Sequence, residues 1–116
     1  MYNYSEMEPG SIKFVPIGNK DELPVNERIF VEIGDLVILV FNIAGGYFAI
    51  GDICSHDDGP LGEGELEEFE VICPRHGARF DVHSGQATAL PAVVDIPAYP
   101  VRIAGNQIEV GVPHAD

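Results

Sequence analysis

Glycine and proline divide this chain into short apolar segments, and this division limits its fold more than any other feature. The 116 residues include thirteen glycines and nine prolines. The segments between them are rich in Val, Ile, Phe and Tyr, and no apolar stripe recurs at the helical period of about 3.6 residues. The pattern therefore predicts an all-β protein.

Three pairs of small or polar residues predict the way in which the strands are joined. Two-residue hairpin turns need residues that tolerate positive φ, and such pairs separate several of the apolar segments. The expected turns are Gly34 with Asp35, Gly45 with Gly46, and Gly105 with Asn106. The expected strands are 12–17, 29–33, 36–43, 47–50, 70–73, 79–82, 99–103 and 107–112. We therefore expect antiparallel sheets, with a loop over 52–66 and loose ends at 1–10 and 113–116.

Size and charge limit the classes of partner. A chain of 116 residues has the usual size of one domain, so we expect a single domain over 1–116. The longest apolar run, 36–41, is far shorter than the roughly 20 residues that cross a bilayer, and the N-terminal residues are acidic rather than basic. We therefore expect a cytoplasmic protein without a membrane partner. Nineteen acidic residues against six basic ones also make nucleic acid an unsuitable partner.

Two short boxes each place one thiol close to one imidazole. The first is Cys54-Ser55-His56, and the second, sixteen residues later, is Cys73-Pro74-Arg75-His76. The first box opens a Gly/Pro loop and the second ends an expected strand, so a β-scaffold can bring the two loop tips together. The boxes then offer two thiolates and two imidazoles to one metal centre.

A zinc site, a cysteine nucleophile and an inert buried thiol each fit less of this pattern. Structural zinc sites use the same side chains, but their paired ligands are usually two to four residues apart, and the first box is tighter. A cysteine nucleophile needs one Cys beside one His and leaves the second box unexplained. A buried thiol with unrelated histidines accounts for any one of the four residues but not for two similar boxes.

The pattern C-x-H followed by C-x-x-H resembles the Rieske iron-sulfur family. Gly77, Phe80 with Asp81, Ser84 with Gly85, and Pro91 fit the same family. The resemblance implies a Rieske-type antiparallel β-sandwich with a small cluster-binding subdomain at about 52–92. It also implies one 2Fe-2S cluster, with one iron on thiolates and the other on imidazoles. The implied ligands are Cys54, His56, Cys73 and His76.

The same resemblance indicates a low reduction potential. High-potential Rieske proteins have a Ser and a Tyr that donate hydrogen bonds to cluster sulfurs, and the matching positions here are Ala78 and Phe80, which have no donor. Those proteins also join the two boxes by a disulfide. Arg75 stands where the second box would need its extra cysteine, so this chain cannot form that bond.

The leading functional hypothesis is a soluble, monomeric ferredoxin that carries single electrons from a reductase to a terminal oxygenase. We expect no enzyme activity and no small-molecule substrate, because four protein ligands and two sulfides saturate the irons. Two alternatives remain open at this stage. One is a small Rieske subunit of a permanent oxidoreductase complex, and the other is an iron-sulfur redox sensor or interaction module.

Several chemically notable residues lie outside the two boxes. His83 and His114 are expected to be exposed bystanders, and the Glu-rich patch at 63–70 is expected to be a solvated loop and strand face. Pro91 and Pro97 belong to a segment that either covers the cluster, as the family resemblance implies, or simply forms a turn.

Overall fold

The computed structural model describes residues 12–53, 61–62, 64–74, 77–90 and 94–113. Within these residues the chain forms strands and one short 3₁₀ helix, and no helix there is long and apolar enough to span a membrane. In chain order the elements are β1 (Ile12–Asn19), η3 (Lys20–Glu22), β2 (Arg28–Ile33), β3 (Leu36–Ile43), β4 (Gly46–Gly51), β5 (Leu66–Glu67), β6 (Glu70–Ile72), β7 (Arg79–Asp81), β8 (Ala87–Ala89), β9 (Ala98–Tyr99), β10 (Val101–Ala104) and β11 (Gln107–Pro113).

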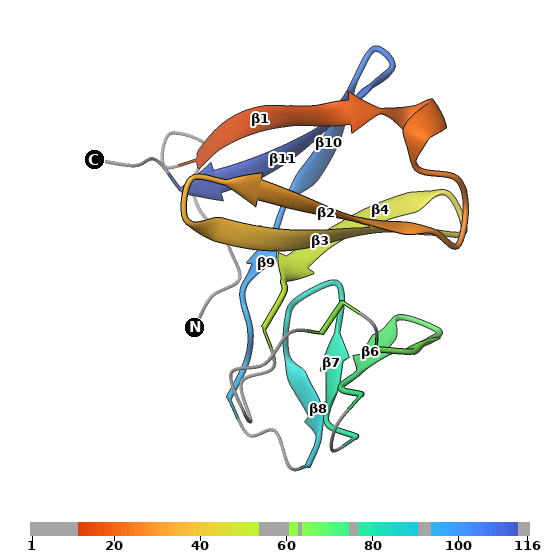
Figure 1. Cartoon of the computed structure of the whole chain (residues 1–116), viewed down its shortest axis with the longest axis vertical. Helices are drawn as coiled ribbons and strands as arrows, with labels where there is room; N and C mark the ends of the chain where they lie inside the picture. Colours follow the sequence, from red (N-terminus) through yellow and green to blue (C-terminus); the bar gives the residue numbers. More distant parts are fainter. Residues whose placement is uncertain (1–11, 54–60, 63, 75–76, 91–93, 114–116) are drawn as a thin grey trace.

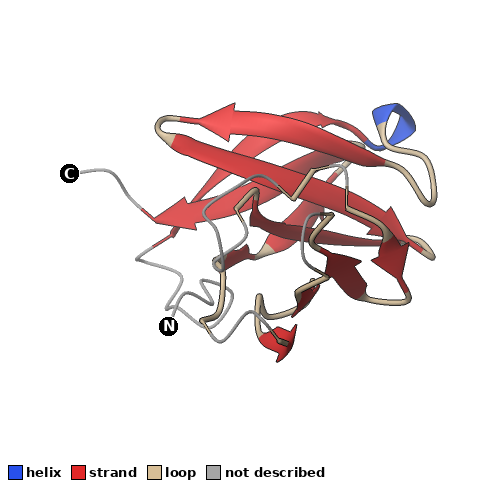
Figure 2. Cartoon of the chain, turned by 60° about the horizontal axis from the view of Figure 1, so that its bottom comes forward, coloured by secondary structure: helices blue, strands red, loops and turns tan. Residues whose placement is uncertain are grey.

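These strands form three sheets stacked along the long axis of the molecule (Figure 1). The upper sheet has the order β1-β11-β10, the middle sheet β2-β3-β4-β9, and the small sheet β5-β6-β7-β8. All strand pairs recorded in the three sheets are antiparallel. Figure 2 shows how far strands dominate the regular structure. The expectation of an all-β, antiparallel fold is therefore confirmed.

The central part of β3, in the middle sheet, is buried on both faces, and this explains most of the longest apolar run in the sequence. Side chains alternate between the faces of a strand. Ile38 and Val40 of β3 pack toward the upper sheet, in a core with Ile108 and Val110. Their neighbours Leu39 and Phe41 pack toward the small sheet, in a second core. A strand covered on both faces needs apolar residues at every position, so 38–41 shows no alternation, whereas Val37 before it is exposed.

The hairpin turns were largely predictable from sequence, with one error. Two-residue turns lie at Gly34 with Asp35 and at Gly105 with Asn106, as expected. The expected turn at Gly45 and Gly46 is wrong, because Ile43 pairs with Gly46 and the turn consists of Ala44 and Gly45, both at positive φ. The physical reason is Asn42, whose buried side-chain oxygen accepts a hydrogen bond of 3.0 Å from the Gly45 amide.

The strand expected at 99–103 is in fact two strands in different sheets. β9 pairs with β4 in the middle sheet, and β10 pairs with β11 in the upper sheet. Pro100 separates them, and since proline has no N–H to continue a ladder, the chain changes sheet at this residue. The carbonyl of Pro100 accepts a hydrogen bond of 2.8 Å from Gly111 of β11.

The remaining departures from the expected elements are small. The sequence pattern does not predict the short strands β5 and β8 or the helix η3, and β5 begins at Leu66, within the expected loop. The expected strands 70–73 and 79–82 each end one residue earlier. Pro113 belongs to β11 rather than to a loose end, while 1–10 and 114–116 lie outside the described residues.

Candidate metal centre

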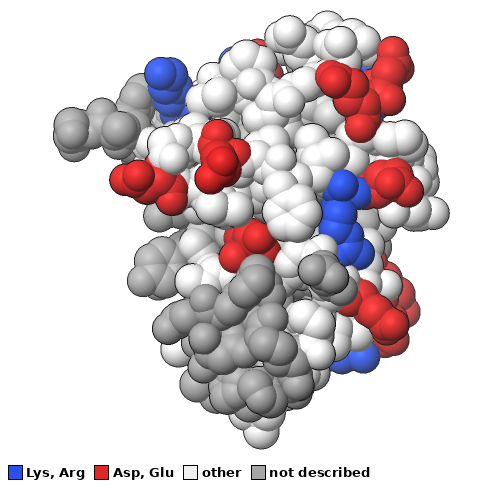
Figure 3. Space-filling view, viewed as in Figure 1, with Lys and Arg blue, Asp and Glu red and all other residues white. Residues whose placement is uncertain are grey.

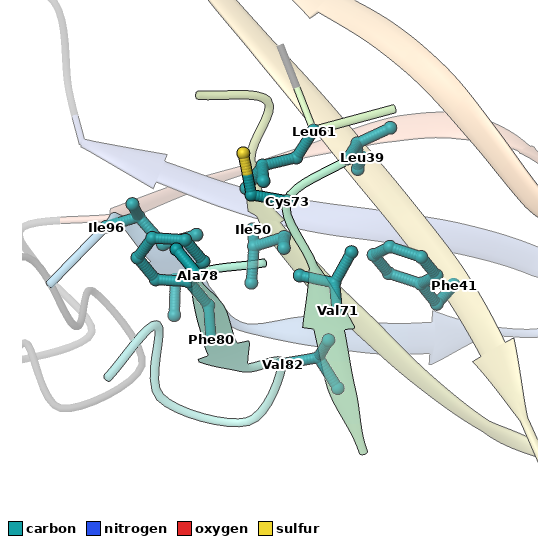
Figure 4. Close-up of a cluster of buried hydrophobic side chains, with 11 residues drawn as sticks. Leu39, Phe41, Ile50, Leu61, Val71, Cys73, Ala78, Phe80, Val82 and Ile96 are labelled. Atoms are coloured by element: carbon teal, nitrogen blue, oxygen red, sulfur yellow. The ribbon is translucent and has the colours of Figure 1, made fainter. Parts of the chain in front are cut away.

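The second box begins at the end of β6, where the chain passes from the core to the surface. Cys73 is buried with 1% of its surface exposed, and Pro74 directly after it is exposed. The side chain of Cys73 lies in the core between the middle and small sheets, beside Leu61 and Ala78 (Figure 4). Among the four expected ligands Cys73 is the one that lies within the described residues. Cys54, His56 and His76 lie outside them.

A tight turn holds the second box in place. The Cys73 amide donates to the Ala78 carbonyl over 2.7 Å, and the Gly77 amide donates to the Cys73 carbonyl over 3.0 Å. Gly77 has a φ of 77°, in the left-handed region that glycine adopts without steric cost. Cys73 is thereby held close to Gly77 and Ala78, at the two ends of the connection between β6 and β7.

Asp52 closes the base of the loop that carries the first box. Its amide donates to the Val37 carbonyl of β3 over 3.0 Å. Its carboxylate accepts a hydrogen bond of 2.7 Å from the Leu61 amide, nine residues further along the chain. Leu61 is fully buried in the same core as Cys73. The two box-bearing loops are therefore anchored in one apolar core, which supports the expectation that they meet at one site.

The core beneath the site offers no side-chain hydrogen-bond donor at the two positions of interest. Ala78 and Phe80 are both fully buried, and both belong to the core that contains Cys73. Neither side chain has a polar hydrogen. The observation agrees with the expectation, drawn from the sequence, that two donors to the cluster sulfurs are missing.

Acidic residues surround the small sheet, and one arginine offsets part of their charge. Arg79 of β7 donates to the carboxylates of Glu67 and Glu70 over 3.1 and 3.0 Å. These two hydrogen bonds raise the pKa of the Arg79 guanidinium above its ordinary value. Figure 3 shows acidic side chains at many places on the visible face and few basic ones among them. Glu65, Glu67 and Glu68 are exposed and Glu70 is half-buried.

His83 is exposed as expected, but it is not an isolated bystander. Its ring centroid lies 4.6 Å from those of both Phe48 and Phe69, and its Nδ1 is 2.9 Å from a carboxylate oxygen of Asp81. Phe48 belongs to the middle sheet and Phe69 to the turn between β5 and β6. His83 therefore helps to join the two sheets. His114 lies outside the described residues.

The residues around Pro97 also help to join the middle sheet to the small sheet. The Pro97 carbonyl accepts a hydrogen bond of 2.9 Å from the Gly51 amide at the end of β4. Gly85 donates to the Asp81 carbonyl, and its own carbonyl accepts from the Ile96 amide over 2.8 Å. Pro97 thus fixes the chain where it enters β9. Pro91 lies outside the described residues.

Sequence reasoning missed the residues that support the site from a distance. Arg28 of β2 donates to the carbonyls of Gly62 and Gly64, and no local pattern in the sequence indicates such a contact. Asp52 offered a weak signal, because short acidic side chains that begin a loop often accept hydrogen bonds from backbone amides. Gly62 and Gly64 offered a clearer one, since glycine in a loop often marks a close approach of the backbone.

Comparison with known proteins gives a consistent result. The family model of the Rieske [2Fe-2S] domain matches residues 13–100. The 3-phenylpropionate/cinnamic acid dioxygenase ferredoxin subunits of Shigella boydii serotype 4 (strain Sb227) and Escherichia coli (strain K12) are each 36% identical to this chain over 95 residues. In both cases the match covers 81% of this chain and 89% of the relative.

Solved structures show the same likeness. The ferredoxin of carbazole 1,9a-dioxygenase from Nocardioides aromaticivorans IC177 is 31% identical, with a TM-score of 0.76, covering 82% of this chain and 95% of that one. The Sphingomonas yanoikuyae B1 ferredoxin is 25% identical, with a TM-score of 0.79, covering 87% of this chain and all of that one. The shared architecture extends over both the upper part of the molecule and the part that carries the two boxes.

Proposed function

This chain belongs to the Rieske [2Fe-2S] domain family, and from that premise we propose which of its residues hold the cluster and how it is used. The cofactor is one 2Fe-2S cluster. The proposed ligands are the thiolates of Cys54 and Cys73 for one iron and the imidazoles of His56 and His76 for the other.

The observation that carries this assignment is the position of Cys73. Its buried thiol lies at the end of β6, in a core that also anchors the returning limb of the first-box loop at Leu61. The donor set has the right chemistry, because thiolate and neutral imidazole are the ligands of Rieske centres. The hydrogen bonds of Asp52 and Ala78 close the bases of the two loops that carry the proposed ligands.

The ligands set the charge of the site. Two thiolates balance the charge of an oxidised 2Fe-2S cluster to zero, whereas four thiolates leave it at about −2. A neutral site accepts an electron more readily, so imidazole ligation places the potential at roughly −150 to +300 mV. The apolar side chains of Ala78 and Phe80 cannot stabilise the reduced state by donating hydrogen bonds. The potential of this protein therefore lies near the lower end of that range.

The protein is an electron carrier of an oxygenase system rather than a catalytic enzyme. The cluster, when bound, supplies one-electron transfer. In this proposal a reductase is the electron donor and a terminal oxygenase the acceptor. The acceptor is supported by the relatives, which are named as ferredoxins of dioxygenases. The net charge of −13 favours docking to basic surfaces on these partners.

We further propose the setting in which this carrier works. It is a single domain over 1–116, with the cluster-binding part at about 52–92, and it acts as a monomer in the cytoplasm. Cysteines that serve as metal ligands are typical of a reducing compartment, which supports this location.

The experiment that tests the ligand assignment compares the four histidines of the chain. Substitution of His56 or His76 by Ala removes a proposed ligand, and so does substitution of either cysteine by Ala. Each of these four variants is expected to lose the cluster, measured as iron and acid-labile sulfide per chain together with the EPR signal after dithionite reduction.

His83→Ala and His114→Ala are the matched controls. Both remove an imidazole that lies outside the proposed ligand set, so both are expected to keep the wild-type signal and the full content of two irons and two sulfides. Retention of the Rieske signal in H56A or H76A, or its loss in H114A, would contradict the assignment.

A further inference from the structure

The edge strand of the middle sheet contacts the loop that carries the first box. Nη1 of Arg28, at the start of β2, donates a hydrogen bond of 2.6 Å to the Gly64 carbonyl and one of 3.2 Å to the Gly62 carbonyl. The two glycines follow Leu61 on the limb by which this loop returns to the small sheet. One side chain of the middle sheet therefore binds two backbone groups that lie 34 and 36 residues away in sequence.

The arginine itself is held in a fixed position. Arg28 is paired with Phe41 across β2 and β3, and its guanidinium carbon lies 5.0 Å from the centre of the Phe41 ring. Phe41 is fully buried in the core that contains Cys73. A cation stacked on a rigid aromatic ring loses little freedom when it binds, so the hydrogen bonds to the loop are pre-organised.

Gly62 and Gly64 each lie very close to another part of the protein. A Cβ at Gly62 would lie 2.2 Å from the ring of Phe30, the residue two positions after Arg28 on the same face of β2. A Cβ at Gly64 would lie 2.1 Å from the carbonyl oxygen of Ile72, at the end of β6. The loop backbone thus passes through a narrow space between the middle and small sheets, where its carbonyls need a donor.

We propose that Arg28 is a positioning residue for the cluster, a role that rests on the proposed function. It fixes the returning limb of the first-box loop against β2 and so slows the opening of that loop and the release of the cluster. Among the described residues Arg28 forms no ion pair with a carboxylate. Its contacts there include the two loop carbonyls and the Phe41 ring.

Arg102 provides a matched control elsewhere in the fold. Its guanidinium also stacks on a phenylalanine, 4.0 Å from the centre of the Phe14 ring, and its Nε donates to Glu109 over 2.6 Å. All of these contacts lie within the upper sheet. Arg102→Met therefore removes a cation–π contact like that of Arg28, together with an ion pair to Glu109, without touching a box-bearing loop.

The experiment uses the full-length protein with R28M, R28K and R102M. One measurement is the rate of cluster release to an iron chelator, followed by the visible absorbance of the cluster. We expect release from R28M to be about tenfold faster, in line with the loss of hydrogen bonds from a charged donor. R28K retains a charged donor and should stay within about threefold of wild type. R102M should release its cluster at the wild-type rate.

The second measurement is hydrogen exchange by mass spectrometry over peptides that cover 61–66. R28M should exchange faster there, with wild-type exchange in β1 and β11, whereas R102M should leave 61–66 unchanged. Equal hydrogen-exchange rates of R28M and R102M over 61–66 would overturn the proposal. Equally fast release of the cluster from R28K and R28M would also overturn it. A wild-type protein without a Rieske signal would refute the proposed function, while the exchange data would still decide whether Arg28 holds the loop.

Discussion

The upper and small sheets use different means to hold their strands. In the upper sheet, β1 and β11 have eight and seven residues and pair from end to end apart from one bulge between Pro16 and Gly18. Ile108, Val110 and Val112 are buried in its core. In the small sheet the strands have two or three residues each. A ladder this short contributes few hydrogen bonds, so the small sheet depends on individual tertiary contacts to a much greater degree.

Those contacts come mainly from glycines and from side chains that bind backbone groups. Gly85 and Gly64 allow backbone segments to approach closely, and Gly62 leaves room for the Phe30 ring. Asp52 and Arg28 bind the loop that carries the first box. The conformation of the small sheet and the box-bearing loops therefore depends on a few individual residues, whereas that of the upper sheet depends on alternating buried residues along its strands. Substitutions in the two regions should therefore differ in their effect on the cluster.

The largest effect is expected when the core below the site is emptied. Phe80→Ala removes a fully buried ring beside Cys73 and should lower the free energy of unfolding by about 3–5 kcal/mol. Chemical denaturation measures this loss. Because the cavity lies under the second box, F80A should also be purified with less than the full content of iron.

Ile108→Ala is the corresponding change in the core of the upper sheet. Ile108 is equally buried, so a loss of about 2–5 kcal/mol is expected, but the variant that remains folded should keep its full iron content and wild-type EPR signal. Equal loss of iron in F80A and I108A would show that both cores support the cluster to the same degree, which would contradict this comparison.

A smaller effect is expected from two glycines that share a positive φ but differ in surroundings. A Cβ at Gly85 would lie 1.9 Å from the Ile96 carbonyl oxygen, whereas Gly105 has nothing within 4 Å. Gly85→Ala should cost about 2–4 kcal/mol, from backbone strain and overpacking together. Gly105→Ala, in an open hairpin of the upper sheet, should cost about 1 kcal/mol. Thermal unfolding compares the two, and equal costs would refute the close approach at Gly85.

The smallest effect is expected from the exposed ion pairs of the small sheet. Arg79→Met removes the hydrogen bonds to Glu67 and Glu70, and because exposed pairs are weak and screened, we expect a small drop in melting temperature that shrinks further at high salt. The folded-state pKa of Arg79 is raised, so its contribution is complete below the ordinary arginine pKa and is lost only at more alkaline pH. A large, salt-independent drop would show that the pairs matter more than their exposure suggests.

The sequence correctly predicted the strands and turns that depend only on neighbouring residues, such as apolar runs and turn glycines. β3 matches its expected bounds, and the turns at Gly34 and Gly105 have the glycine that positive φ requires. The turn at Ala44 was missed because a distant contact decides it, since the amide group of Asn42 bonds both to the Leu23 carbonyl and to the Gly45 amide. The change of sheet at Pro100 also depends on which neighbours the chain meets.

The same distinction between local signals and distant contacts applies to the candidate site. The two boxes were visible in sequence because two cysteines and two histidines at close spacing carry their own chemical signal. The support from Arg28 was not, because it binds backbone carbonyls, and any segment has those. The buried, donor-free positions Ala78 and Phe80 were identified through the family resemblance, and their burial agrees with it.

The most direct test of the account is an EPR-monitored redox titration of the purified protein. We predict a rhombic signal of a mixed thiolate and imidazole 2Fe-2S cluster, appearing with a one-electron Nernst curve whose midpoint lies at about −150 mV. A midpoint above about +100 mV would contradict the low-potential carrier. A silent sample that contains stoichiometric zinc would contradict the cluster assignment itself.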